Sequence, residues 1–145
     1  MPKRPLIHEA ITQDVIGAFY EVYNILGYGF VEQVYKLALE LELRRRGHVV
    51  AREVGLPVYF KGELLCEQRI DLLVDGRVVV ELKATPTLPP TGARQTLNYL
   101  RGAGLRVGML LHFGPEPKFF PVVNARATES AEVTVETQYR GESRN

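Results

Sequence analysis

Three charged residues on two neighbouring segments of this chain have the types and spacing needed for metal-dependent chemistry. Asp71 lies in one apolar segment, and Glu81 and Lys83 lie in the next, with one residue between them. Two carboxylates can hold a divalent cation, and an ammonium group beside them can steady the water that attacks a phosphate. The pattern indicates metal-dependent cleavage of phosphodiester bonds. The alternative is that Glu and Lys simply make an exposed strand soluble.

The turn between the two segments decides whether the carboxylates can meet. Side chains alternate between the two faces of a strand. A two-residue turn at Asp75-Gly76 would set Asp71 opposite Val80, and Glu81 would then point away from Asp71. The metal site therefore requires an odd-numbered or bulged turn. Gly76 in the left-handed region of a three-residue turn would supply it.

Residues on two predicted helices extend this candidate site. Glu32 lies in the first turn of one helix, where a carboxylate suits the positive end of the helix dipole and could also be a further metal ligand. Tyr35, three residues later, is expected to pack or hydrogen-bond below it. Gln95 and Tyr99 are four residues apart on another helix, so they share one side of it and could orient a metal-bound water or a phosphate.

The helices that must position these residues follow from the apolar spacing. Apolar residues recur at intervals of three or four over residues 6–26 and 30–46. Gly27-Tyr28-Gly29 separates the two segments, because paired glycines favour a turn. A third helix is expected over about 93–102, after a proline-rich loop at 85–92. The predicted buried face of the second helix consists of Val31, Val34, Tyr35, Ala38 and Leu41.

Strands are expected over residues 49–60, 63–74, 77–84, 105–113 and 119–123, which are rich in β-branched and other apolar residues. The first and last contain a proline, which marks an edge or irregular position in a sheet. The order α-α-β-β-β-α-β-β predicts an α/β fold of the mixed α+β kind. It would have a mixed sheet of four to five strands flanked by helices.

The 145 residues suit one domain, which we expect to occupy residues 1–124. Residues 125–145 are more polar and are expected to form a tail. In this tail, Val133 and Val135 belong either to a short edge strand or to a disordered segment.

The composition excludes several classes of protein. Hydrophobic residues make up 46% and charged residues 24%, as in ordinary globular domains. No apolar span or secretory signal is visible, so we expect no membrane partner and a cytoplasmic location. The single cysteine, Cys66, excludes an intrachain disulfide and a cysteine-based zinc cluster. The net charge of +1 argues against a protein that coats DNA non-specifically, but not against a nuclease.

The segment Gly29-Phe30-Val31-Glu32-Gln33-Val34-Tyr35 is a Gly-x-x-Glu-x-x-Tyr motif. Over about residues 8–124 the chain resembles the GxxExxY protein family. That family is grouped with the PD-(D/E)xK nuclease superfamily, on its RecB-like and lambda-exonuclease-like side. The resemblance implies a restriction-endonuclease-like core and a Mg²⁺- or Mn²⁺-dependent nuclease. The site residues that it implies are the metal ligands Asp71, Glu81, Glu32 and the Leu82 backbone carbonyl, the water-activating Lys83, and the helix pair Gln95 and Tyr99. We also expect Arg69 and Tyr35 to contact the substrate.

The chain departs from the family pattern at three positions. Members of the family often have a histidine where this chain has Tyr23 and another where it has Gly92. A late Asn-Phe pair of the family appears here as His112-Phe113. A histidine at the end of an apolar strand is usually a packing or hydrogen-bonding residue, so His112 is not included in the predicted site. If the missing histidines contribute to catalysis, activity or substrate choice differs in this chain.

Two main hypotheses about function follow. The first is a metal-dependent nuclease that hydrolyses DNA phosphodiester bonds. The second is a catalytically weak or inactive nuclease-fold module that binds nucleic acid or a protein partner, as the small size, near-neutral charge and missing histidines suggest. A phosphohydrolase of small nucleotides would need a closed pocket. The sequence leaves open whether the chain is an enzyme, whether it would be an endonuclease or an exonuclease, whether it prefers DNA or RNA, and whether it forms a homo-oligomer.

Overall fold

The computed structural model describes residues 7–134. Within them the chain forms three helices and five strands in the predicted order. The elements are α1 (Ile7–Leu26), α2 (Glu32–Arg45), β1 (Val50–Phe60), β2 (Glu63–Val74), β3 (Val78–Lys83), α3 (Gly92–Ala103), β4 (Val107–Phe113) and β5 (Pro117–Val123). The bounds differ from the predicted ones by about two residues at most, as is usual at the ends of elements. The predicted fold class is therefore confirmed.

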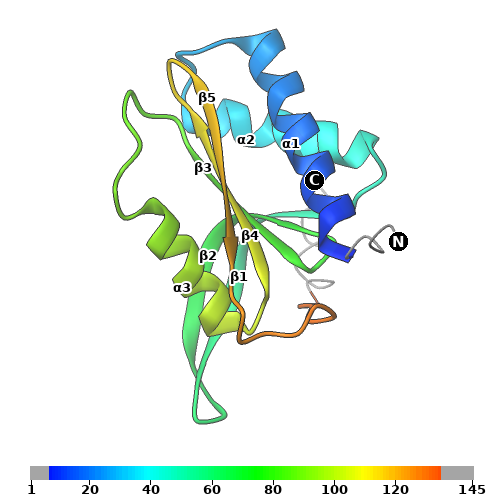
Figure 1. The fold of residues 1–145 in the computed structure, drawn as a ribbon, viewed down its shortest axis with the longest axis vertical. Helices are drawn as coiled ribbons and strands as arrows, with labels where there is room; N and C mark the ends of the chain where they lie inside the picture. The colour runs from blue at the N-terminus through cyan, green and yellow to red at the C-terminus, as the bar shows by residue number, and fades with distance from the viewer. Residues whose placement is uncertain (1–6, 135–145) are drawn as a thin grey trace, which may run out of the picture.

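The five strands form one mixed sheet in the order β1-β2-β3-β4-β5. Strands β3 and β4 are parallel and α3 makes the crossover between them, while the other neighbouring strands are antiparallel. Helices α1 and α2 lie on one face of the sheet and α3 lies on the other (Figure 1). Both strands that contain a proline, β1 and β5, are edge strands. No helix within residues 7–134 is long and apolar enough to cross a membrane.

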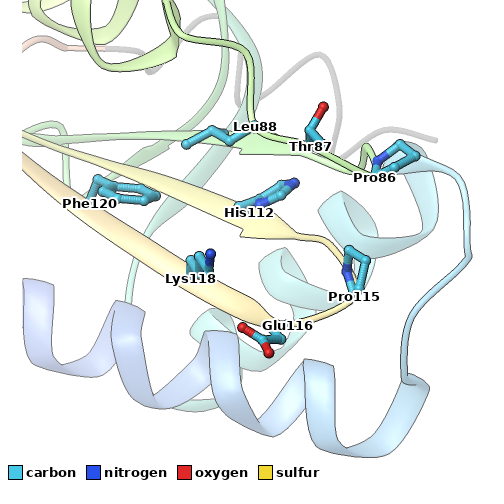
Figure 2. A pocket seen from close by; sticks show the side chains of 8 residues that line it. All are labelled: Pro86, Thr87, Leu88, His112, Pro115, Glu116, Lys118 and Phe120. Atoms are coloured by element: carbon cyan, nitrogen blue, oxygen red, sulfur yellow. The ribbon is translucent and has the colours of Figure 1, made fainter.

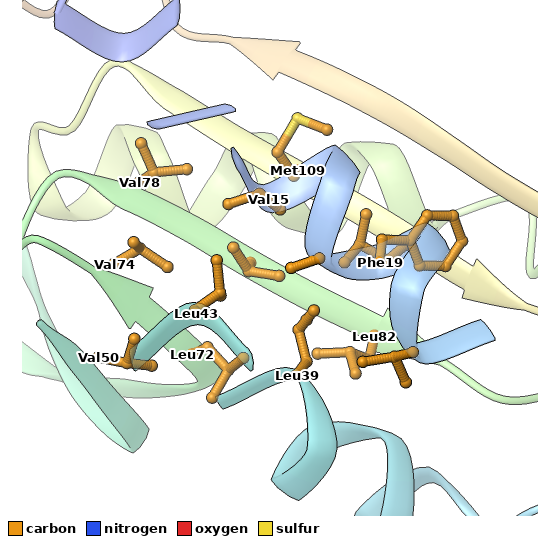
Figure 3. Packing of buried hydrophobic residues seen from close by; sticks show 14 of the residues in the cluster. Val15, Phe19, Leu39, Leu43, Val50, Leu72, Val74, Val78, Leu82 and Met109 are labelled. Carbon is orange, nitrogen blue, oxygen red and sulfur yellow. The ribbon is translucent and has the colours of Figure 1, made fainter. Parts of the chain in front are cut away.

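The larger core cluster lies between the sheet and helices α1 and α2. Phe19 and Leu39 from the two helices pack with Leu72 and Leu82 from β2 and β3 (Figure 3). A second cluster, which includes Val79 and Leu100, lies between the sheet and α3. Because β4 is covered on both faces, all seven of its residues are buried and it has a continuous apolar sequence rather than an alternating one.

The buried face of α2 differs from the predicted one. Val31 is 70% exposed and Leu41 is 51% exposed. The residues of α2 that are buried are Tyr35, Lys36, Leu39, Glu40 and Leu43. Two charged residues thus lie on the face that packs against the sheet, where each forms ion pairs. The predicted face is right at Tyr35, which is fully buried, and at Ala38, which packs against the core, but wrong at Val31 and Leu41. An apolar pattern cannot mark Lys36 and Glu40 as buried, because both are charged.

The turn between β2 and β3 has the odd length that the candidate site requires. Val74 pairs with Val78, so three residues connect the strands, and both Asp75 and Gly76 adopt positive φ angles, of 54° and 66°. A side chain at Gly76 would place its Cβ only 2.7 Å from the carbonyl oxygen of Val133. Glycine is therefore required here both for the turn and for the close approach of Val133, whose N–H donates to the Gly76 carbonyl. Val133 lies outside any strand, and Val135 lies outside the described residues.

His48 holds the same turn against α1. Its Nδ1 lies 2.6 Å from Asp75 Oδ2 and its Nε2 lies 2.7 Å from Asp14 Oδ2. The other carboxylate oxygen of Asp75 accepts a hydrogen bond from the Val49 N–H. Burial lowers the pKa of His48, but the hydrogen bonds to the two carboxylates outweigh it, and the pKa is raised above its ordinary value of 6.5. Because both ring nitrogens face carboxylates, the charged imidazolium is the form that this clamp stabilises.

The clamp predicts a pH-dependent loss of stability. A raised pKa in the folded state means that the contribution of His48 is fully present below pH 6.5 and is lost as the pH rises through the folded-state value. The His48→Gln variant should therefore be about 1–2 kcal/mol less stable than the wild type at pH 6. The difference should shrink by pH 9. Urea unfolding of both proteins at the two pH values measures it, and a difference that grows with pH would contradict the clamp.

Candidate functional site

The site forms where β2 and β3 separate. Their backbone pairing ends at Leu72 and Val80. Beyond this level, carboxylate side chains accept the hydrogen bonds of backbone N–H groups that no longer pair across the two strands. The N–H of Asp71 donates to Glu81 Oε1, and the N–H of Leu82 donates to Asp71 Oδ2, both at 2.8 Å. Each carboxylate is thus held by the backbone of the opposite strand, and Asp71 and Glu81 lie side by side as the three-residue turn requires.

An irregularity in β1 accompanies this separation. Arg52 pairs with Leu72 and Val54 pairs with Ile70, but Glu53 between them has a φ of 55°. A left-handed residue in the middle of a strand bends the chain. The register is the same on both sides of Glu53, so Glu53 lies at the level of Asp71. The Glu53 carboxylate lies 3.6 Å from the ammonium of a lysine on α2.

That lysine is Lys36, which is not among the predicted site residues. Its Nζ lies 2.9 Å from Asp71 Oδ1, and the residue is only 7% exposed. Burial lowers the pKa of Lys36, but the hydrogen bond and charge of Asp71 outweigh this effect and leave the pKa raised. The sequence does contain a signal for Lys36. It lies four residues after Glu32, which is the spacing of residues that share one face of a helix.

Glu81 and Glu32 both lie in surroundings that disfavour the charged form of a carboxyl group. Burial, together with the neighbouring charge of Asp71, raises the pKa of Glu81 to about 8, and Glu81 is only 5% exposed. Burial and the charge of Asp71 also raise the pKa of Glu32. The charges of Lys36 and Lys83 act in the opposite direction on Glu32, as does a hydrogen bond from the backbone of Ala84. Glu32 at the start of α2 therefore lies beside the end of β3.

Helix α3 brings Tyr99 to the site from the other face of the sheet. The pKa of the Tyr99 hydroxyl is raised by burial and then by the charges of Glu81 and Asp71. Gln95 is exposed one helical turn earlier on α3. The structure thus places Glu32, Asp71, Glu81, Lys83 and Tyr99 within electrostatic reach of one another, and among the described residues no contact joins the exposed Gln95 side chain to them.

The two residues expected to contact substrate differ in their positions. Arg69 is exposed, and its guanidinium Nη1 donates to the Glu53 carbonyl at 2.6 Å, which ties β2 to the bend in β1. The prediction that Tyr35 contacts the substrate is wrong, because its side chain is fully buried. Its hydroxyl donates to the Gly27 carbonyl at 2.5 Å, and its ring stacks on Phe113 with centroids 4.2 Å apart. Tyr35 therefore holds the loop before Glu32 in place.

The two positions that lack the family's histidines have packing roles. The Tyr23 hydroxyl donates to the Gly114 carbonyl at 2.7 Å and lies 2.9 Å from the Pro115 carbonyl. Gly92 begins α3, where an added Cβ would lie 2.9 Å from Cδ2 of Leu110. A larger side chain at Gly92 would force the buried Leu110 side chain to shift.

The ligand atoms of Asp71 and Glu81 are of the kind that a hard divalent cation prefers. Asp71, Glu81 and the Leu82 carbonyl offer only oxygen atoms, which Mg²⁺ and Mn²⁺ prefer. A cation would also offset the burial and the neighbouring charge of Asp71 that raise the pKa of Glu81. Among residues 7–134, no three His, Cys, Asp or Glu side chains lie close enough together to hold an ion, so Glu32 does not complete a three-acid cage here. Two carboxylates suffice for Mg²⁺, which usually keeps several waters and binds substrate phosphates.

Comparisons with known proteins agree with this arrangement. The family model described as the PD-(D/E)XK nuclease superfamily matches residues 9–120. Among solved structures, the crystal structure of SSO0001 is similar at a TM-score of 0.50 and 18% sequence identity, and this likeness concerns the fold alone. The match covers 94% of this chain and 65% of that chain, so the present chain spans just under two thirds of SSO0001. No curated protein is significantly similar in sequence.

Proposed function

We propose, since this chain belongs to the PD-(D/E)XK nuclease superfamily, that it is a Mg²⁺- or Mn²⁺-dependent nuclease that hydrolyses DNA phosphodiester bonds. The observation that carries the proposal is the pairing of Asp71 with Glu81 where β2 and β3 separate, with Lys83 two residues further on. Within the superfamily we assign the chain to the GxxExxY family on its Gly29–Tyr35 motif. The catalytic unit is taken to be the single domain of residues 1–124.

In this proposal the side chains of Asp71 and Glu81 and the carbonyl of Leu82 would hold the cation. When bound, such an ion polarises the scissile phosphate and lowers the pKa of a water. Lys83 places an ammonium two residues beyond Glu81 on the same strand, where it stabilises negative charge that develops during attack. Gln95 and Tyr99 on α3 provide hydrogen-bonding groups from the opposite side that orient the phosphate or the water.

Cleavage of DNA that depends on a divalent cation and on Lys83 tests this function. The purified protein should cut single- or double-stranded DNA in Mg²⁺ or Mn²⁺ and should leave both intact in EDTA. Replacement of Lys83 by methionine removes one electrostatic contact to the transition state and should lower kcat about 100-fold. Lys61→Met, which removes an exposed lysine of the β1–β2 turn, is the matched control and should change nothing.

The proposal fails if the wild type binds DNA equally well with and without metal and never cuts it. It also fails if Lys83→Met and Lys61→Met cut at the same rate.

A further inference from the structure

A pocket with a volume of about 340 Å³ lies between strands β4 and β5 and the loop that follows β3 (Figure 2). The loop that follows β3 covers one side of it, and β4, β5 and the turn between them form the rest. Its volume is at the lower end of the range of small-ligand sites, roughly 300–1,000 Å³. The residues that line it are Pro86, Thr87, Leu88, His112, Pro115, Glu116, Lys118 and Phe120.

The pocket is one strand away from Lys83. Lys83 and His112 are directly paired across the parallel strands β3 and β4. Neighbouring strands lie about 4.8 Å apart, and directly paired residues project from the same face of the sheet. The loop that covers the pocket begins directly after Lys83, and His112 Nε2 lies 2.8 Å from the carbonyl of Thr85 in that loop. A strand of nucleic acid at the carboxylates would therefore reach the pocket within about one nucleotide.

His112 forms part of the wall and carries a buried ring nitrogen without a hydrogen-bond partner among the described residues. The residue is 5% exposed, and because Nε2 must donate to the Thr85 carbonyl, Nδ1 is the acceptor of the neutral ring. Nδ1 is buried and has no hydrogen-bond partner among the described residues. Buried polar atoms are normally paired. Gly114 allows the ring this position, since a Cβ there would lie 2.6 Å from Cε1 of His112.

The other wall residues suit a flat heterocycle that carries a phosphate. Phe120 is 37% exposed and can stack on a base, with the proline rings as further apolar surface. Lys118 offers an exposed ammonium for a backbone phosphate, and Glu116 offers a carboxylate that can accept from the amino group of a base. The hydrogen bonds of Tyr23 to the β4–β5 turn hold this wall in place.

We propose that this pocket binds one unstacked nucleotide of the substrate strand, next to the phosphate that is cleaved. The inference rests on the proposed nuclease function. A base must leave the duplex to stack on Phe120, so single-stranded or frayed DNA should bind more tightly than an intact blunt duplex.

Binding in EDTA tests the pocket separately from cleavage. The probe is a short single-stranded DNA with one 2-aminopurine base, whose fluorescence changes when the base stacks. Phe120→Ala should weaken binding roughly 10-fold, whereas the control Phe60→Ala, at an exposed position on the β1–β2 hairpin, should leave it unchanged. Phe120→Leu keeps apolar volume without the flat ring and should also weaken binding. Lys118→Gln should lower the slope of log K against log salt by about 0.7.

Equal affinities of Phe120→Ala and Phe60→Ala would overturn the proposal, as would equal affinities for the single strand and a blunt duplex. Tight binding of the free 2-aminopurine mononucleotide, equal to that of the oligonucleotide, would also overturn it, because the pocket would then serve small nucleotides. If Phe120→Ala weakens binding in a protein that cuts no DNA, the pocket stands and the nuclease function fails. If the protein cuts DNA and Phe120→Ala binds normally, the nuclease function stands and the pocket proposal fails.

Discussion

The Glu81→Gln variant should lose cleavage by about 1,000-fold and should at the same time be more stable than the wild type in EDTA. Loss of one carboxylate ligand removes several kcal/mol of transition-state stabilisation, and each 1.4 kcal/mol is a factor of ten. Glutamine keeps the Oε1 atom that accepts the hydrogen bond from the Asp71 N–H. It removes only the charge that burial and Asp71 make unfavourable.

The pH dependence of this stabilisation follows from the direction of the pKa shift. The pKa of Glu81 is about 8 in the folded protein, against an ordinary value of 4.5. A raised pKa means that stability is unaffected below about pH 4.5 and is lost as the pH rises from there through 8. The gain in the variant should therefore be near zero at pH 4 and about 2–3 kcal/mol at pH 7–8.

Urea unfolding in EDTA at pH 4 and pH 8 measures the gain, and a nuclease assay in Mn²⁺ measures the loss. Glu63→Gln, which removes an exposed carboxylate at the start of β2, is the matched control for the loss of one negative charge. A Glu81→Gln protein that is less stable than the wild type at pH 8 would show that burial and the charge of Asp71 do not disfavour the ionised Glu81. Full activity in that variant would remove Glu81 from the site.

The order of elements could be predicted from the sequence because it depends on local signals, whereas the odd turn was inferred as a condition for Asp71 to meet Glu81. Apolar spacing marks α1 and the buried strand β4, and glycine at position 76 is typical of a turn that needs a positive φ. The register that sets Asp71 beside Glu81 then follows from simple parity across the three-residue turn. These features depend on residues that lie close together in the chain.

The buried face of α2 could not be predicted in the same way. Lys36 and Glu40 are charged, and a pattern of apolar residues places such positions in solvent. Their burial depends on partners from distant parts of the chain, Asp71 for Lys36 and Arg52 for Glu40. The same long-range pairing explains why Lys36 was missing from the predicted site, and why Tyr35, on the buried face, contacts Phe113 rather than a substrate.

The pairing of Lys36 with Asp71 has a consequence for the cation that the site is proposed to hold. In the protein without metal, the ammonium of Lys36 lies 2.9 Å from Asp71 Oδ1 and offsets part of the negative charge of Asp71 and Glu53. A divalent cation bound by Asp71 and Glu81 would neutralise the same negative charge of Asp71 that Lys36 offsets. The ammonium and the cation therefore compete electrostatically, and removal of Lys36 should strengthen cation binding.

Lys36→Met should lower the stability of the metal-free protein by about 3 kcal/mol, because it leaves Asp71 partly buried without its counter-ion. Methionine retains most of the apolar stem of lysine, so little packing is lost. Saturating Mn²⁺ should then raise the Tm of the variant by more than it raises that of the wild type. Calorimetric titration with Mn²⁺ should show a lower Kd for the variant.

The double variant Lys36→Met with Asp71→Asn supplies the control, since it removes both charges of the pair. It should recover much of the lost stability in EDTA but should show no stabilisation by Mn²⁺, because the aspartate ligand is gone. If Lys36→Met is as stable as the wild type in EDTA, the ion pair contributes little. If its Kd for Mn²⁺ rises instead of falling, Lys36 supports the cation through the position it gives Asp71, and does not compete with it.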